Sequence, residues 1–207
     1  IAVLAVAIGA TTLSGLVTIA VDVPAQMARE IRSYGANLVV TPAGDVPITD
    51  EAVTAATAQV PASALVGSAS FDYETVTIND QPFGAGGADL AAVLAMNPYW
   101  YVDGDWPEAS GQILVGEQVA STIDVKAGDT ITVSQLDASA SSKAAAQSGA
   151  QASALKVDPR TVTLTVSGIL KTGGNEDGYV YMSTSDMDAL IGTSGTVSLA
   201  EYSITLE

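Results

Sequence analysis

Oxygen-bearing side chains follow one another at one point of this sequence where they could bind a metal ion. Asn175, Glu176 and Asp177 lie in the segment TGGNEDG, between two predicted strands. Carboxylate and amide oxygens are the ligands that calcium prefers. Their spacing lacks the alternation of an EF-hand loop, and a hairpin loop is the simpler interpretation. Two interpretations therefore remain open: the three residues bind calcium, or they form a hairpin loop that holds no metal.

Two further segments resemble catalytic or phosphate-binding patterns. Asp103 and Asp105 in YVDGDWP would be a carboxylate pair, but catalytic glycosidase pairs come from separate elements, and Asp-Gly favours a turn. The glycine cluster PFGAGGAD at 82–89 lacks the Gly-Lys-Ser/Thr of a phosphate loop. We therefore expect a glycine-rich turn at 84–87 and no catalytic residue in either segment.

The composition narrows the classes of function further. The chain has no cysteine and no histidine, which excludes disulfides, thiolate catalysis and Cys or His metal sites. The formal net charge is −16, and the stretch 33–125 holds twelve acidic residues and no Lys or Arg. Such a surface repels phosphate backbones, so nucleic acid is not an expected partner. The acidic face is either a solvated surface or a cation-binding one, and we expect neither an enzyme nor a cofactor in this chain.

An uncharged apolar run opens the sequence. Residues 1–21 contain no charged side chain and would span about 30 Å as a helix, enough to cross a bilayer. A cleaved signal peptide and a buried soluble helix are the alternatives. We expect a transmembrane helix over 1–23, a stalk helix over 24–35 that begins at Pro24, and an extracytoplasmic core domain over 36–207. The bulk of the chain would then lie outside the cell membrane.

Beyond the stalk, apolar periodicity switches repeatedly between two and 3.6 residues, which predicts an α+β fold. The low-complexity segment 137–156 is rich in Ala, Ser and Gln, and predicts an inserted loop. Alternating or β-branched runs predict strands at 37–41, 64–79, 112–116, 129–136, 161–166, 178–182 and 202–206. Capping signals and helical periodicity predict helices at 51–59, 88–96, 117–123 and 183–191.

Three ordered blocks resemble a known family. The first holds Gly35, Asn37 and Pro42, the second Gly116, Ala120, Gly128 and Asp129, and the third Gly168, Ile169 and Leu170. In this order they resemble the extracytoplasmic core domain of MacB-like and FtsX-like ABC transporter permeases. Their residue types are structural: Gly128-Asp129 suits a tight turn, and Gly168 within a strand suits a bulge or a close backbone contact.

The resemblance implies a transport component without catalysis of its own. It implies a mixed α/β subdomain near the membrane, and a mostly β subdomain inserted at about 97–176. It also implies a four-helix permease that works as a dimer, either homodimer or heterodimer, with a separate ABC ATPase subunit inside the cell. The domain would couple ATP hydrolysis to export or to mechanical transmission towards an extracytoplasmic partner or cargo. A membrane-anchored acidic binding or adhesion module is the alternative, and the sequence does not indicate the cargo.

Overall fold

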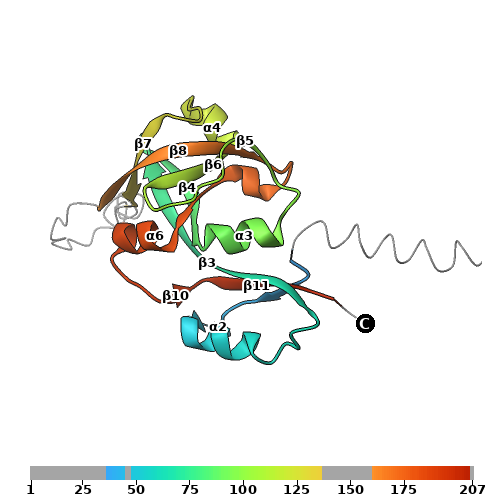
Figure 1. Cartoon of the computed structure of the whole chain (residues 1–207). Helices are drawn as coiled ribbons and strands as arrows, with labels where there is room; N and C mark the ends of the chain where they lie inside the picture. Colours follow the sequence, from blue (N-terminus) through green and yellow to red (C-terminus); the bar gives the residue numbers. More distant parts are fainter. Residues whose placement is uncertain (1–35, 45–47, 137–159, 206–207) are drawn as a thin grey trace, which may run out of the picture.

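The computed structural model describes residues 36–44, 48–136 and 160–205 (Figure 1). The predicted transmembrane helix (1–23), the stalk (24–35) and the low-complexity loop (137–156) lie outside these ranges. Within them, no helix has the length and apolar character needed to cross a membrane. The described residues therefore belong to the predicted core domain, 36–207.

A single long strand, β3 (Leu65–Ile78), pairs along both of its edges and organises the sheet. One edge of β3 pairs with β4 (Gln81–Ala88) through a two-residue hairpin in which Asn79 and Asp80 both have positive φ, 51° and 62°. A two-residue turn in which both residues have positive φ matches the twist of the two strands that it joins. The other edge is divided, because β11 (Leu199–Ile204) covers the first half of β3 and β7 (Thr130–Gln135) covers its last three residues. As a result, β3 belongs to two parts of the fold at once.

Six strands close into a barrel. β4 pairs with β9 (Tyr179–Ser183), β9 with β6 (Gln112–Gly116), β6 with β8 (Thr161–Lys171), and β8 with β7, which returns to β3. Closure leaves the ring without a free edge. Alternate residues of these strands, all buried, form the inner core: Val76, Ile78, Ala85, Ile113, Val115, Ile131, Val133, Leu164, Val166, Val180 and Met182.

Two helices complete this inner core. α4 (Glu117–Ile123) supplies Val119 and Ala120, while α6 (Thr184–Ile191) supplies Met187 and Leu190. Figure 1 shows α4 at the top of the barrel and α6 at the lower left. Asp124 and Gly192, both in the left-handed conformation, end the two helices. The helices thus cover apolar strand residues that would otherwise face solvent.

A second core lies on the outer face of the barrel. There α3 (Leu90–Met96) packs its buried Leu90, Val93 and Met96 against Phe71 and Tyr181. The segment with Trp100, β5 (Tyr101–Gly104) and Trp106 closes over the same cluster. β5 also pairs with β8, so this layer is joined to the barrel by backbone hydrogen bonds.

The base of the domain is built on the first half of β3. β1 (Leu38–Val40) pairs with β11, which pairs with β3. The helix α2 (Asp50–Thr57) packs here, and its Thr57 hydroxyl lies 3.1 Å from the hydroxyl of the buried Tyr202. Two short strands, β2 (Ile48–Thr49) and β10 (Thr196–Val197), pair beside it.

The structure confirms the mixed α/β class, with four α-helices and a large mixed sheet in its described part. The expected turn at 84–87 is wrong, because these glycines lie inside β4. They leave room for aromatic rings: a Cβ at Gly84 would overlap the ring of Tyr179. The segment 97–176 contributes β5, β6, β7 and β8 to the same sheet as β3 and β4, so its separate identity as a subdomain stays a prediction.

The close approach of the 3-10 helix η1 (Asn175–Gly178) to Gly116 generates a stability prediction. A Cβ at Gly116 would overlap the carbonyl of Asp177 and lie 2.7 Å from the carbonyl oxygen of Tyr179. Because both neighbours are backbone, Gly116→Ala should lower the free energy of unfolding by about 2 kcal/mol. Denaturant unfolding of the full chain measures this.

Gly178→Ala is the matched control, because its Cβ would meet only the side chain of Gln118, at 3.7 Å. We expect this variant to change the free energy of unfolding by less than about 0.5 kcal/mol. Equal stabilities for the two alanine variants would contradict the close packing of η1 on Gly116.

Candidate functional site

Asn37 joins the first strand of the described domain to the last. Its backbone N–H donates to the carbonyl oxygen of Tyr202 at 2.9 Å. Its side-chain Nδ2 donates to the carbonyl oxygen of Ile204 at 2.7 Å, and its Oδ1 accepts from the Ile204 N–H at 2.9 Å. The carboxamide therefore acts like one more peptide group in the ladder between β1 and β11.

This arrangement brings the two ends of the domain together. Leu38, the first residue of β1, pairs with Tyr202 near the end of β11. Thr205 then donates from its N–H and its hydroxyl to the carbonyl oxygen of Ala64, at 2.7 and 3.0 Å, just before β3. A force applied at Asn37 would reach β11 and β3 through hydrogen bonds alone.

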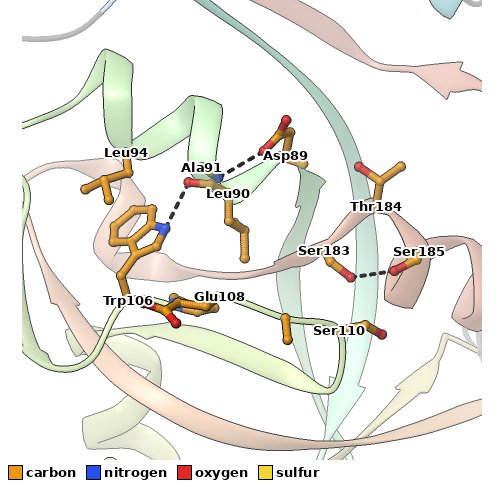
Figure 2. Close-up of a pocket in the computed structure, with 13 residues that line it drawn as sticks. Asp89, Leu90, Ala91, Leu94, Trp106, Glu108, Ser110, Ser183, Thr184 and Ser185 are labelled. Carbon is orange, nitrogen blue, oxygen red and sulfur yellow. Dashed lines mark hydrogen bonds between the residues drawn. The ribbon is translucent and has the colours of Figure 1, made fainter.

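A pocket of about 560 Å³ opens between α3, the segment after β5 and the start of α6 (Figure 2). Leu90, Leu94, Trp106 and Pro107 give it an apolar wall, and Leu94 is 40% exposed. The indole Nε1–H of Trp106 donates to the carbonyl oxygen of Leu90 at 2.9 Å, which fixes the ring against α3. The opposite side carries hydroxyl groups, including those of Ser110, Ser183 and Ser185.

A buried carboxylate holds the hydroxyl side of this pocket. Asp186 is 6% exposed and accepts from the Ser110 hydroxyl at 2.6 Å, the Gly111 N–H at 2.9 Å and the Ser183 hydroxyl at 2.7 Å. The Ser183 hydroxyl in turn accepts from the Asp186 N–H, as an N-cap does. These contacts fix the loop before β6 to the start of α6, and they engage Ser183 in capping. The pocket is therefore suited to contact rather than to nucleophilic chemistry.

Asp177, one of the three calcium candidates, makes hydrogen bonds within its own loop. Asp177 is buried, and its carboxylate accepts from the N–H and hydroxyl of Thr172 at 2.7 and 3.0 Å and from the Gly173 N–H at 2.9 Å. It folds the loop onto itself, whereas Asn175 is exposed. Across the described ranges, no three acidic side chains converge as metal ligands would. The geometry gives the calcium interpretation no support.

The motif residues occupy turns and close contacts. Gly128 has a φ of +94° and donates its N–H to Val166 at 2.7 Å, while Asp129 accepts from the Lys126 N–H at 2.8 Å within the same turn. Gly168 follows a register shift between β6 and β8, and a Cβ there would overlap Val102 and lie 2.8 Å from the Asp105 carbonyl oxygen.

The remaining motif and carboxylate candidates lie apart from one another. Pro42 follows β1, and Gly35 is outside the described residues. Ala120 is buried in α4. Asp103 lies in β5, where it forms an ion pair with Lys171 at 3.5 Å. Asp105 instead follows the strand, and its N–H donates to the Ser167 carbonyl oxygen at 2.9 Å.

Sequence reasoning missed the pocket beside Trp106 and the carboxylate of Asp186. Trp106 and Ser110 lie about eighty residues from α6 in the chain, so no local spacing connects them. One usable signal was present: aromatic residues are rare in this chain, at 5%, and both tryptophans fall within seven residues, at Trp100 and Trp106. Such a concentration of large rings favours a packed surface layer.

The Asn37 contacts generate a second prediction. Asn37→Ala removes two side-chain hydrogen bonds from the ladder, and should lower the stability of the β1–β11 pair by about 1–2 kcal/mol. In hydrogen exchange of the full chain, the Ile204 amide should then exchange at least about tenfold faster. Asn175→Ala, at an exposed asparagine, is the control and should leave this amide unchanged. Unaltered exchange at Ile204 in Asn37→Ala would contradict the role of the carboxamide.

Comparison with known proteins places this fold. No curated protein matches the chain. The periplasmic region of MacB from Actinobacillus actinomycetemcomitans is similar in structure, with 8% identity, a TM-score of 0.51, and coverage of 81% of this chain and 73% of that one. The extracellular domain of the noncanonic ABC-type transporter YknZ from Gram-positive bacteria has 11% identity, a TM-score of 0.49, and coverage of 81% and 82%. The model of the MacB-like periplasmic core domain family matches residues 1–206, and this chain belongs to that family.

Proposed function

We propose that this chain is the extracytoplasmic part of an ABC transporter permease, and that it transmits movement from the membrane to the outside. The observation that carries the proposal is the Asn37 ladder, which joins the strand where the domain begins to the strand where it ends. A domain held at one end by two adjacent strands is suited to move as a lever. Family membership and the similarity to the MacB periplasmic region support this reading.

The path of the movement follows the shared strand. Displacement of the segment before Asn37 would pull β11, which pairs with β3 over residues 65–71. The same β3 enters the closed barrel through β7 and β4. Since barrels and packed cores resist deformation, the base and the barrel would move as one body.

The partners in this proposal follow from the family. ATP binding and hydrolysis would belong to a separate ABC ATPase subunit, and a second permease copy would pair with this one in the membrane. The domain itself would hold no cofactor and do no chemistry. The net charge of −16 argues against nucleic acid as a partner.

A membrane-anchored binding module is the second candidate, and the apolar pocket beside Trp106 favours it. The complete gene separates the two proposals. Three further hydrophobic spans after residue 207 and a neighbouring ATPase gene support the permease. A cell-wall anchor in place of those spans supports the module.

Replacing the predicted stalk with a flexible or a rigid segment tests whether the stalk transmits movement. In the full-length permease, residues 25–34 are replaced either by a Gly-Ser sequence or by an Ala-Glu-Lys helix of equal length. Flexible Gly-Ser chains do not transmit displacement, so this variant should lose transport, whereas the helical variant keeps it. Transport is scored by rescue of the phenotype that deletion of the gene causes.

Co-purification of the ATPase subunit serves as the control, because both variants should assemble with it as the native permease does. Full rescue by the Gly-Ser variant would reject transmission through the stalk.

A further inference from the structure

A second pocket, of about 240 Å³, lies on the outer face of the barrel and shares no lining residue with the pocket beside Trp106. Three tyrosines from β3 and β9 line it together with residues of η1 and β11: Tyr73, Asn175, Glu176, Tyr179, Tyr181 and Leu199. The ring of Tyr179 meets that of Tyr73 edge to face, with centroids 5.6 Å apart and planes at 74°. It lies 6.4 Å from the ring of Tyr181. Tyr181 is 2% exposed, so Tyr179 and the half-buried Tyr73 supply most of the accessible aromatic surface of the pocket.

The glycines of β4 make this arrangement possible. β4 lies between β3 and β9, where Gly86 is opposite both Tyr73 and Tyr181, and Gly84 is opposite Tyr179. A Cβ at Gly86 would lie 3.0 Å from the Tyr181 ring and 3.1 Å from the Tyr73 ring. Because these positions lack side chains, the rings lie across β4. The glycines of the segment GAGGA thus provide the space in which the three tyrosine rings pack.

One acidic side chain lines the pocket and a second lies beside it. Glu176 lines it, and Glu201 lies on the same face of β11 as Leu199, two residues away. Burial raises the pKa of Glu201, and the nearby charge of Glu176 raises it further. In the described part of the chain both ion pairs use Lys171, with Asp103 and Glu117, so neither Glu176 nor Glu201 forms an ion pair there.

The phenols of Tyr73 and Tyr181 remain neutral at physiological pH. Burial raises the pKa of Tyr73 and of Tyr181, and neighbouring groups, including Glu201 and Glu176, raise both further. Neutral tyrosine rings keep the negative faces that attract cations. The pocket thus combines aromatic faces with carboxylates, without a positive side chain among its lining residues.

We propose that the pocket formed by Tyr73, Tyr179, Tyr181 and Glu176 binds an organic ammonium group, either a quaternary ammonium or a primary amine. Aromatic faces and a nearby carboxylate are the surroundings that such a cation prefers. A metal ion fits less well, because across the described ranges no three acidic side chains gather as ligands. The proposal is independent of force transmission, since it concerns the outer barrel face and not the Asn37 ladder.

The test titrates the full chain, in a non-ionic detergent at pH 7 and low salt, with four small probes. Choline and tetramethylammonium represent quaternary ammonium ligands, and n-butylamine represents an amine such as a lysine side chain. The uncharged 3,3-dimethylbutanol has the shape of choline without its charge. Calorimetry and saturation-transfer NMR should show saturable binding of an ammonium probe, at least about fivefold tighter than 3,3-dimethylbutanol.

Matched variants assign the binding to the pocket. Glu176→Gln keeps the shape of the side chain and removes its charge, and Tyr179→Leu removes a ring that is 36% exposed. Each should weaken binding about three- to tenfold. The controls are Glu74→Gln, on the opposite face of β3, and Tyr99→Leu, at a tyrosine 72% exposed outside the pocket. Both controls should bind the probe as the native chain does.

The preferred probe then separates the sources of the ammonium group. Tighter binding of choline identifies a quaternary ligand, and tighter binding of n-butylamine identifies an amine. Binding of 3,3-dimethylbutanol as tight as that of the preferred ammonium probe, an unchanged affinity for that probe in Glu176→Gln, or no saturable binding of any ammonium probe would each overturn the proposal.

Discussion

The unbroken strand β3 is the constraint on which the rest of this domain depends. Its fourteen residues pair with β11 at the base and with β4 and β7 in the barrel. No other described strand joins both regions so extensively, and the Asn37 ladder fixes β1 to the same sheet. The base and barrel therefore share one hydrogen-bonded framework, on which the proposed lever depends.

Side-chain complementarity across strands explains most of the unusual local sequence. Gly84 and Gly86 make room for tyrosines of neighbouring strands, Gly116 makes room for η1, and Gly168 makes room for β5 and the residues after it. Buried carboxylates act in the same structural way, since Asp177 folds its own loop and Asp186 fixes the loop before β6 to α6. Asp177, one of the calcium candidates of the sequence, is thus engaged in holding the backbone of its loop.

Local periodicity was sufficient to predict the four helices and most of the longer strands, whereas contacts distant in sequence were not predictable. Alternation in Val162, Leu164 and Val166 identified β8, and capping by Ser183 identified the start of α6. The glycine segment of β4 was misread as a turn, because its strand conformation depends on rings about a hundred residues away. Barrel closure, β5 and the Trp106 pocket likewise depend on register between distant strands. The family resemblance rested on spaced glycines and Asn37, and the family match confirms it.

The most direct test of the proposed lever is a distance measurement between two copies of this chain in the proposed permease dimer. This chain has no cysteine, so Thr163→Cys on the exposed face of β8 gives a single spin-labelling site within it. Pulsed electron resonance with the ATPase subunit present should show a shift of the distance between copies when ATP is added. An identical distance distribution with and without ATP would contradict the account.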